Sequence, residues 1–215
     1  MTVVVSYGSN RVRHLRRKGQ QILEAARTVF LEAGFDTSSM DAIARQAGVS
    51  KATLYAHFEN KEDLFEALIR FECQTIGANF YRPDPLAEAW ADELEKLATN
   101  LRKLFSENDV PAVYRIIVPV ASRFPRLAQI FFEEGPGAAI RDTMAYLETL
   151  CEAGHLQIPD LEIAAEQFIF LVSGDLELRG ALSLPRRPAE KGRELTRSSI
   201  AMFIQYYSKP APSAL

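Results

Sequence analysis

Hydrophobic residues recur at the spacing of an α-helix along most of the chain. The first such pattern is formed by Ile22, Ala25, Ala26, Val29, Phe30 and Ala33. It predicts a helix over residues 12–33 that stops at Gly34. Two short apolar segments follow at residues 40–47 and 50–58, and a long helix is predicted over residues 61–80.

The helical periodicity continues to the end of the chain, so the predicted fold class is all-α. Further helices are predicted over residues 86–105, 111–122, 125–134, 138–153, 161–182 and 189–208. The β-branched run VYRIIVPV at residues 113–120 leaves a buried strand open as an alternative. Pro119 would remove a backbone hydrogen bond from its helix. The resulting kink could open space for a ligand or only bend the helix around the core.

The two short segments have the spacing of a helix-turn-helix. Ala44 is small enough to let the second helix cross close to the first, Gly48 tolerates the backbone of the turn, and Leu54 fills the angle between the helices. Ser38 and Ser39 compete to cap the first helix. In a helix-turn-helix the second helix lies in the major groove of DNA. The alternative is an ordinary helical hairpin inside a core.

The start of the second helix carries groups that suit DNA. Ser50 can cap the helix and leave backbone N–H groups for a phosphate. Lys51, Ala52 and Thr53 lie in the first turn, where base edges are reached. Thr53 could instead be only a surface hydroxyl.

A second side of the same segment offers further hydrogen-bond donors. Tyr55, His57 and Lys61 carry a hydroxyl, an imidazole and an ammonium, which suit phosphate oxygens. For His57 the alternative is a structural histidine, and for Lys61 it is the solvated start of the next helix. Together these groups favour binding to DNA.

The distribution of charge agrees with two domains of different chemistry. The net charge of the chain is −3, but residues 1–61 hold nine Lys/Arg against five Asp/Glu, a net of +4. The remaining residues hold sixteen against twenty-three, a net of −7. We therefore expect a DNA-binding domain over residues 1–61 and a control domain over residues 62–215.

The densest basic run lies near the start of the chain and comprises Arg11, Arg13, Arg16, Arg17 and Lys18. It could extend the first helix toward the DNA backbone or reach a minor groove. A solvated, frayed arm is the alternative.

Aromatic residues are spread over the helices predicted for the acidic domain. The candidates for the wall of an apolar ligand pocket are Phe105, Tyr114, Phe124, Phe131, Phe132, Tyr146, Phe168 and Phe170. Arg115, Arg123 and Glu177 are candidate polar anchors for the same ligand. The same aromatic residues could instead fill a solid core.

The last two predicted helices favour a dimer. Residues 161–182 are apolar nearly all round, so that helix needs cover on two sides. The final helix, residues 189–208, carries a stripe formed by Leu195, Ser199, Met202, Phe203 and Tyr206. Two such helices from each chain would make a four-helix bundle between protomers. Asp175 and Arg179 are spaced to form an ion pair on a helix surface or at this interface.

Several function classes lack support in the sequence. No run of eighteen apolar residues exists, and the apolar start of the chain is too short for a secretory signal, so we expect neither a membrane span nor export. Cys73 and Cys151 lie far apart and suggest reduced thiols in a cytoplasmic protein. Phosphate-binding, metal-binding and nucleophile motifs are absent from the sequence, so we expect no cofactor, no metal and no enzyme.

The helix-turn-helix region resembles the DNA-binding domain of the TetR family of bacterial repressors over residues 16–68. The resemblance rests on Gly48-Val49-Ser50, Thr53-Leu54-Tyr55, His57-Phe58 and Lys61. It implies that the residues in contact with operator DNA are Ser39, Lys51, Ala52, Thr53, Tyr55, His57 and Lys61.

Residues 112–184 also resemble the AefR-like C-terminal domain of that family, which implies roles in dimerisation and effector binding. We therefore expect a homodimeric repressor that a small apolar effector releases from double-stranded operator DNA, bound to the nucleoid in a bacterial cytoplasm. The alternatives are a constitutive or structural DNA-binding regulator without an effector, and an enzyme with an accessory helix-turn-helix.

Overall fold

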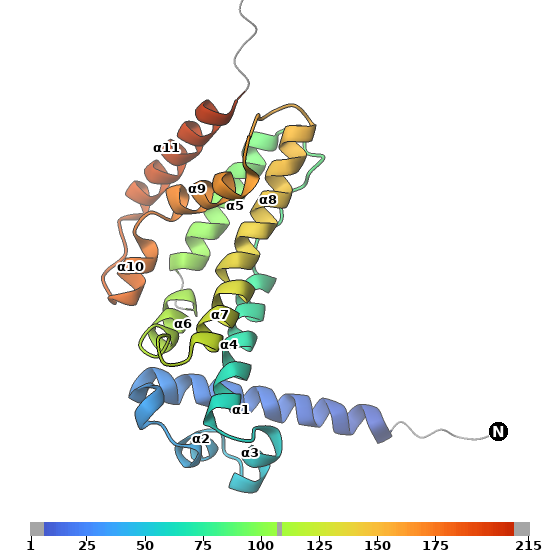
Figure 1. The fold of residues 1–215 in the computed structure, drawn as a ribbon, viewed down its shortest axis with the longest axis vertical. Helices are drawn as coiled ribbons and strands as arrows, with labels where there is room; N and C mark the ends of the chain where they lie inside the picture. The colour runs from blue at the N-terminus through green and yellow to red at the C-terminus, as the bar shows by residue number, and fades with distance from the viewer. Residues whose placement is uncertain (1–6, 107–108, 209–215) are drawn as a thin grey trace, which may run out of the picture. The chain divides into compact units, whose positions relative to one another are not determined.

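The computed structural model describes residues 7–106 and 109–208, with side chains over 17–106 and 110–208. The expected roles of the Arg11, Arg13 and Arg16 side chains therefore lie outside the described residues. Apart from one isolated bridge between Leu156 and Ser208, the regular structure in the described part is helical. The all-α fold predicted from the sequence is confirmed (Figure 1).

The described part of the chain forms a succession of separate helices. The first four are α1 (Tyr7–Thr37), α2 (Met40–Gln46), α3 (Lys51–His57) and α4 (Lys61–Ala78). The others are α5 (Trp90–Ser106), α6 (Asp109–Ile117), α7 (Pro125–Glu134), α8 (Pro136–Glu152), α9 (Leu161–Ser173), α10 (Leu176–Ala181) and α11 (Ala189–Tyr207).

Packing divides the chain into two compact units. Unit 1 runs to Glu72 and also includes Ile116–Ala128, while unit 2 comprises Cys73–Arg115 and the residues from Gln129 onward. Helices α4, α6 and α7 each carry residues of both units. The functional boundary that we expected between residues 61 and 62 stays a prediction.

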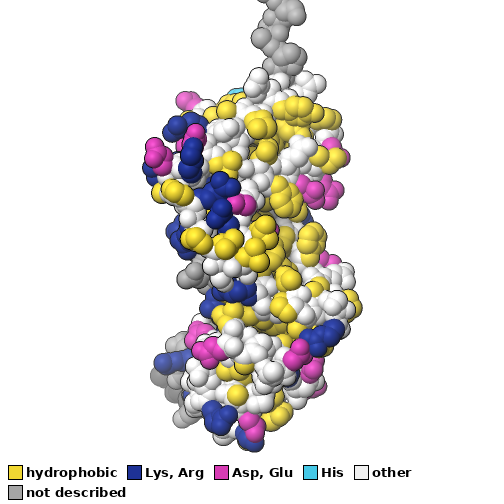
Figure 2. All heavy atoms as spheres, turned by 90° about the vertical axis from the view of Figure 1, so that its left-hand side faces the viewer, with side chains coloured by type: hydrophobic (Ala, Val, Ile, Leu, Met, Phe, Trp, Pro, Cys, Tyr) yellow, Lys and Arg dark blue, Asp and Glu magenta, His cyan; other side chains and the backbone are white. Residues whose placement is uncertain are grey.

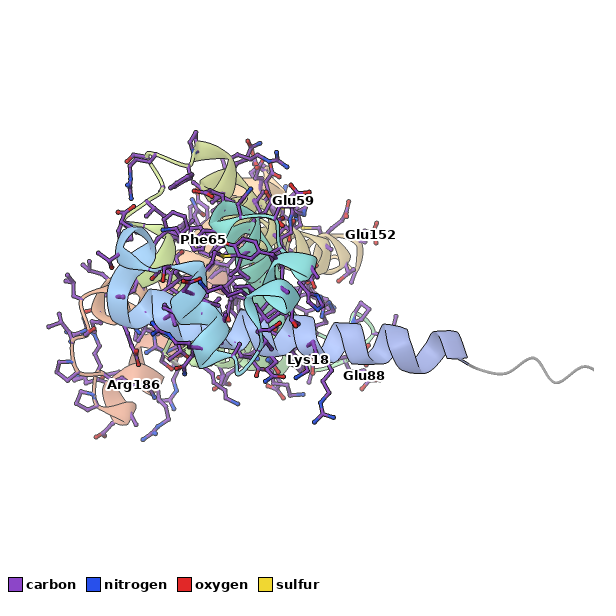
Figure 3. All side chains as sticks on the ribbon, turned by 90° about the horizontal axis from the view of Figure 1, so that it is seen from below. Lys18, Glu59, Phe65, Glu88, Glu152 and Arg186 are labelled. Carbon is purple, nitrogen blue, oxygen red and sulfur yellow. The ribbon has the colours of Figure 1, made fainter. Side chains whose placement is uncertain are left out.

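Aromatic side chains form the centre of unit 1. Gly34 has φ 77° and interrupts α1 where the sequence predicted its end. The chain then brings Phe35 against Phe65, with ring centroids 4.7 Å apart, and Phe30 packs on Phe65 at 5.3 Å. Phe65 lies among the helices of this unit (Figure 3) and is fully buried. Such ring pairs add to the burial of their apolar area.

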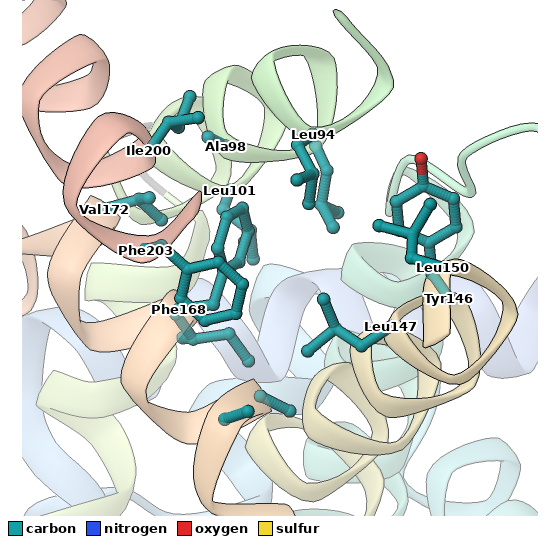
Figure 4. Packing of buried hydrophobic residues seen from close by; sticks show 14 of the residues in the cluster. Leu94, Ala98, Leu101, Tyr146, Leu147, Leu150, Phe168, Val172, Ile200 and Phe203 are labelled. Carbon is teal, nitrogen blue, oxygen red and sulfur yellow. The ribbon is translucent and has the colours of Figure 1, made fainter. Parts of the chain in front are cut away.

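In unit 2, α5, α8, α9 and α11 surround one hydrophobic core. Phe168 of α9 and Phe203 of α11 meet edge to face at 5.1 Å, next to Leu101 of α5 (Figure 4). Ser199 also faces inward, where its hydroxyl donates to the carbonyl of Leu171. Ser199 and Phe203 therefore belong to the core of their own protomer, which corrects the interface stripe expected on the last helix.

The region around Pro119 differs from the sequence prediction. Helix α6 ends at Ile117, and residues 118–123 form turns, so Pro119 does not kink a helix. Proline disfavours helical backbone at the residue before it, which accounts for this early end. The strand alternative for residues 113–120 is wrong, because residues 113–117 are helical.

The helix predicted over residues 161–182 is two helices, α9 and α10. Gly174 separates them with φ 58° and ψ −122°, and a Cβ there would lie 2.9 Å from a methyl carbon of Leu195. The backbone conformation favours glycine, and a side chain here would also have to displace the end of Leu195. Asp175, just after the break, forms the expected ion pair with Arg179 at 2.7 Å.

A carboxylate on α5 fixes the chain that follows α4. Glu93 is 5% exposed and accepts hydrogen bonds from the Lys96 ammonium (2.6 Å), the Tyr81 hydroxyl (2.6 Å) and the Asp84 backbone N–H (3.0 Å). These donors, Lys96 first, lower the pKa of Glu93 from 4.5 to about 2. The ionised carboxylate is the form that unit 2 stabilises.

We expect Glu93→Gln to destabilise unit 2 at neutral pH and to flatten its acid dependence. Because the pKa of Glu93 is depressed in the folded state, its contribution is complete above pH about 4.5 and is lost as the pH falls toward 2. Thermal unfolding of both proteins between pH 7 and pH 3 should show the melting temperatures converging. Glu95→Gln, an exposed change on the same helix, is the control; a constant gap at all pH values would contradict this role.

Candidate nucleic-acid interface and ligand cavity

The turn between α2 and α3 has the geometry of a helix-turn-helix. Ala44 and Leu54 are buried at 2% and 0% exposure, and Gly48 has φ 61°, a conformation that favours glycine. The backbone N–H of Val49 donates to the carbonyl of Ala44 at 3.0 Å and closes the turn. Each of these three positions has the structural role predicted from the sequence.

Serine side chains cap both helices of the motif. Ser39 caps α2, because its hydroxyl oxygen accepts the backbone N–H of Ala42 at 3.1 Å. Ser38, the competing candidate, is buried and donates its hydroxyl to the carbonyl of Gly34. Ser50 caps α3 by accepting the backbone N–H of Thr53 at 3.0 Å, and the two hydroxyl oxygens lie 2.8 Å apart.

The outer face of α3 remains open to solvent. Lys51, Ala52 and Tyr55 are exposed, and Thr53 is half-buried beside the cap. His57 is also half-buried: a Cβ placed on Gly19 of α1 would lie 3.7 Å from its Nδ1. The face therefore offers a hydroxyl, an ammonium and the partly covered imidazole to a ligand on the outside of α3.

An ion pair occupies Lys51 in the free protein. Its ammonium lies 2.5 Å from a carboxylate oxygen of Asp41 on α2, and both side chains are more than half exposed. A surface pair of this kind stabilises little, so an incoming phosphate can compete for the ammonium. Asp41 is nevertheless a negative charge on the surface expected to meet DNA.

The ammonium of Lys61 is engaged inside unit 1. It donates to the carbonyls of Phe35 (2.7 Å), Ser38 (3.0 Å) and Asp36 (3.3 Å), and it lies 4.4 Å above the centre of the Phe35 ring. An ammonium has three donors. In this structure Lys61 therefore holds the end of α1, and its expected contact with phosphate stays a prediction.

The segment Ile116–Ala128 contacts the same end of α1. Arg123 forms two parallel hydrogen bonds to the carboxylate of Asp36, at 2.8 and 2.7 Å, and these lower the pKa of Asp36. Phe124 packs edge to face on Phe35 with centroids 5.2 Å apart. Arg123 and Phe124 were candidates for a ligand site in the acidic domain, but their contacts place them in unit 1.

Unit 2 contains an apolar cavity of ≈ 110 Å³, hereafter the apolar cavity. Its wall includes Ile76 and Gly77 of α4, Tyr114 of α6 and Phe131 of α7. Phe105, Tyr114 and Phe131 are the predicted aromatic residues that line it, and Tyr114 meets Phe131 edge to face at 5.2 Å.

Other candidates for the ligand site lie elsewhere. Phe168 is fully buried in the core of unit 2, and Tyr146 packs in the same core with its hydroxyl donating to the carbonyl of Trp90. Arg115 donates to the carbonyl of Gly180 on the surface. These three residues do not line the apolar cavity, since helix packing directs them elsewhere. Phe132 and Phe170 do not line it either, because both side chains are more than half exposed.

Glu177 does not line the cavity either, but its carboxyl lies close enough to the Tyr114 side chain, which does line it, to interact with the hydroxyl. Burial raises the pKa of the Glu177 carboxyl, and the bond to Tyr114 opposes that shift. Burial also raises the pKa of Tyr114, and the charge of Glu177 adds to this. The cavity wall thus includes the Tyr114 hydroxyl, which lies beside the Glu177 carboxyl, and the charged residues Arg82, Glu134 and Asp142.

Sequence reasoning missed the partners of these side chains. Asp41 and Asp36 carry no local signal, because Lys51 and Arg123 reach them only in the folded chain. Residues 185–197, PRRPAEKGRELTR, are rich in Lys and Arg. This basic run was visible in the sequence, but the expected DNA-binding and effector sites do not include it.

The geometry of α2 and α3 is that of a helix-turn-helix protein. Residues 92–209 match the C-terminal domain of AefR-like transcriptional repressors, and residues 22–68 match the tetR family of bacterial regulatory proteins. The first match alone covers more than half of the chain, so the chain belongs to the TetR family. Both resemblances seen in the sequence are confirmed, the second over a longer range.

Individual relatives agree with this family. The solved structure of the Flavonoid-responsive Regulator FrrA is 38% identical, with a TM-score of 0.80 over 91% of this chain and 99% of its own. The Fatty acid metabolism regulator protein of Bacillus subtilis (strain 168) is 37% identical over 42% of this chain and 45% of its own. The HTH-type transcriptional repressor BepR of Brucella suis biovar 1 (strain 1330) is 39% identical over 39% of this chain and 44% of its own. The chain thus spans about half the length of the curated relatives it matches.

Within the described residues, none of the helices has both the length and the apolar composition needed to cross a membrane.

We expect Lys61→Ala to lower the free energy of unfolding by about 1–2 kcal/mol, because three carbonyls lose a charged donor. Chemical denaturation measures this loss. Lys18→Ala, which removes an ammonium bonded to Gln21 at 3.2 Å in the same unit, is the control and should change stability less. Unchanged stability together with a large loss of DNA affinity would identify Lys61 as a phosphate contact.

We expect Asp41→Asn to raise affinity for operator DNA more than for random DNA, because it frees the Lys51 ammonium for base edges and removes a carboxylate that repels DNA. Fluorescence anisotropy with operator and random fragments measures both affinities. Glu59→Gln, at another exposed carboxylate of unit 1, is the control. Equal gains on operator and random DNA would contradict the release of Lys51 for base contacts.

Proposed function

We propose that this protein is a homodimeric repressor that binds operator DNA through α3 and is released by a small apolar effector. The observation that carries the proposal is the outer face of α3: a helix capped by Ser50 whose Lys51, Ala52 and Tyr55 side chains stay exposed. The family match over residues 22–68 supports the same conclusion. A constitutive regulator without an effector is the second candidate.

In the proposed complex two groups of residues make different contacts with DNA. Phosphates are bound by Ser39, Tyr55 and His57, and these contacts fix the position of α3. Phosphate contacts do not depend on the DNA sequence. Lys51, Ala52 and Thr53 face base edges from the first turn of α3 and supply the sequence preference. The Ser50 hydroxyl is used by its own cap, so its contribution is to present the first turn.

Exposed apolar side chains on α9 and α11 support a dimer. Ile163 and Phe170 of α9, and Met202 and Tyr206 of α11, are each more than half exposed. Exposed apolar groups that cluster on neighbouring helices favour association. To bind both halves of an operator, such a dimer would have to hold its two copies of α3 about 34–36 Å apart, one turn of DNA.

The apolar cavity supports an effector that is mostly hydrophobic. Because FrrA is described as flavonoid-responsive and covers nearly this whole chain, flavonoids are the first class of compound to test. The cavity volume of ≈ 110 Å³ is below the roughly 300–1,000 Å³ of sites for drug-sized ligands. Such a ligand would therefore bind a wider form of unit 2, and the Tyr114 hydroxyl would orient its polar group.

Three helices offer a route from this cavity to unit 1. Ile76, Tyr114 and Phe131 line the cavity from α4, α6 and α7, and each of these helices also carries unit 1 residues. Widening the cavity would shift these helices and change the spacing of the two α3 copies. Near-complete release needs a ligand preference of about 10⁴-fold for the wider state.

The test uses position 77, where glycine leaves room in the cavity wall. A Cβ at Gly77 meets no heavy atom within 4 Å, so a side chain can start at this position, and Gly77→Leu is chosen to occupy the cavity. We expect this variant to keep its operator affinity and to lose most of its response to a flavonoid. Footprinting identifies the operator, and fluorescence anisotropy with increasing flavonoid measures release.

Gly77→Ala is the matched control and should keep both binding and response, since a methyl group fills little of the cavity. Release of Gly77→Leu at the wild-type flavonoid concentration would place the effector elsewhere. Tight operator binding by every protein with no release by any apolar compound would favour the constitutive regulator. Absence of binding to any DNA fragment at low salt would refute the proposal as a whole.

A further inference from the structure

A second hollow in unit 2 has a basic lining. It has a volume of ≈ 510 Å³ and lies between α5, the chain before α11, and α11 itself. This hollow, hereafter the basic hollow, is lined by six basic side chains: Arg102, Lys103, Arg186, Arg187, Arg193 and Arg197. Figure 2 shows Lys and Arg side chains gathered on the face that carries α10 and α11.

The described acidic residues compensate only part of the charge of the basic hollow. Among the described residues that line it, Glu95 is the only acidic one, in a part of the chain whose net charge is −7 over residues 62–215. Arg187 shares the carboxylate of Asp175 with Arg179, at 2.9 and 2.7 Å. Arg186 and Arg193 are exposed and form no ion pair with any described residue; Arg186 lies on the outside of the ribbon (Figure 3).

Arg102 shows that the site is built into the fold. Its guanidinium donates to the carbonyl of Val172 at 2.6 Å and is half-buried. A Cβ at Gly192 of α11 would lie only 3.0 Å from the guanidinium, so glycine at that position makes room for it. Glycine inside a helix costs stability relative to alanine. Burial lowers the pKa of Arg102, the neighbouring Arg187 adds to this shift, and the charge of Asp175 opposes it.

We propose that the basic hollow binds a small molecule carrying two or more phosphate groups. Each phosphate brings a charge of about −1.5 to −2 near neutral pH, so two phosphates balance most of the excess in a compact volume. The planar fork of a guanidinium also fits phosphate oxygens with paired hydrogen bonds. The hollow shares no lining residue with the apolar cavity, so this site is distinct from the proposed effector site.

The test measures pyrophosphate binding to the full-length protein by isothermal titration calorimetry at constant ionic strength. The double variant Arg186→Ser/Arg193→Ser removes two exposed side chains that the fold does not use. We expect its affinity for pyrophosphate to fall by about tenfold or more, because charge-assisted hydrogen bonds are lost. Lys191→Ser is the matched control: Lys191 is on α11, does not line the hollow and pairs with Glu194, so its loss should change affinity less than about twofold.

Several results would overturn the proposal. Equal losses in the double variant and in Lys191→Ser would mean that only the general field attracts the anion. Citrate binding as tightly as pyrophosphate would refute the preference for phosphate. A double variant with a changed oligomeric state would identify a second copy of the chain as the occupant, and one with weaker DNA binding and unchanged pyrophosphate binding would identify duplex DNA. None of these results depends on whether the apolar cavity binds an effector.

Discussion

The end of α1 depends on one ammonium from further along the chain. Gly34 turns the backbone out of the helix, which leaves carbonyl groups without helical partners. Lys61, the first residue of α4, donates to three of these carbonyls and covers the ring of Phe35. The last of these carbonyls belongs to Ser38, and the next residue, Ser39, caps α2. The same contact therefore fixes where the helix-turn-helix begins. The position of α3 within unit 1 therefore depends on the Lys61 ammonium, which binds these carbonyls and covers the Phe35 ring.

The elements that local chemistry decides were predictable from the sequence. Ala44, Gly48 and Leu54 specify the turn by size, backbone freedom and burial, and all three have the expected role. The break at Gly174 was not predictable from the apolar pattern, because that pattern continues on both sides of it. Its cause is tertiary: Leu195 of α11 packs where a side chain at position 174 would lie.

The candidate sites show the same division. Ser50 caps α3 through a neighbour three residues away, which sequence spacing reveals. Lys61 and Arg123 reach acceptors 26 and 87 residues away, which no local pattern contains. Likewise, composition finds the aromatic residues, but only the packing of distant helices separates Tyr114, at a cavity, from Phe168, in a solid core.

Unit 1 is discontinuous in sequence, and this limits how the protein can be cut or recombined. A fragment that stops at Glu72 would keep α1 to α3 but would lose Phe124 from the Phe35 ring and Arg123 from Asp36. A chimera that exchanges α1 to α3 with those of a relative must also exchange residues 116–128. Otherwise the graft would expose an aromatic surface to water and leave a carboxylate without its counter-ion.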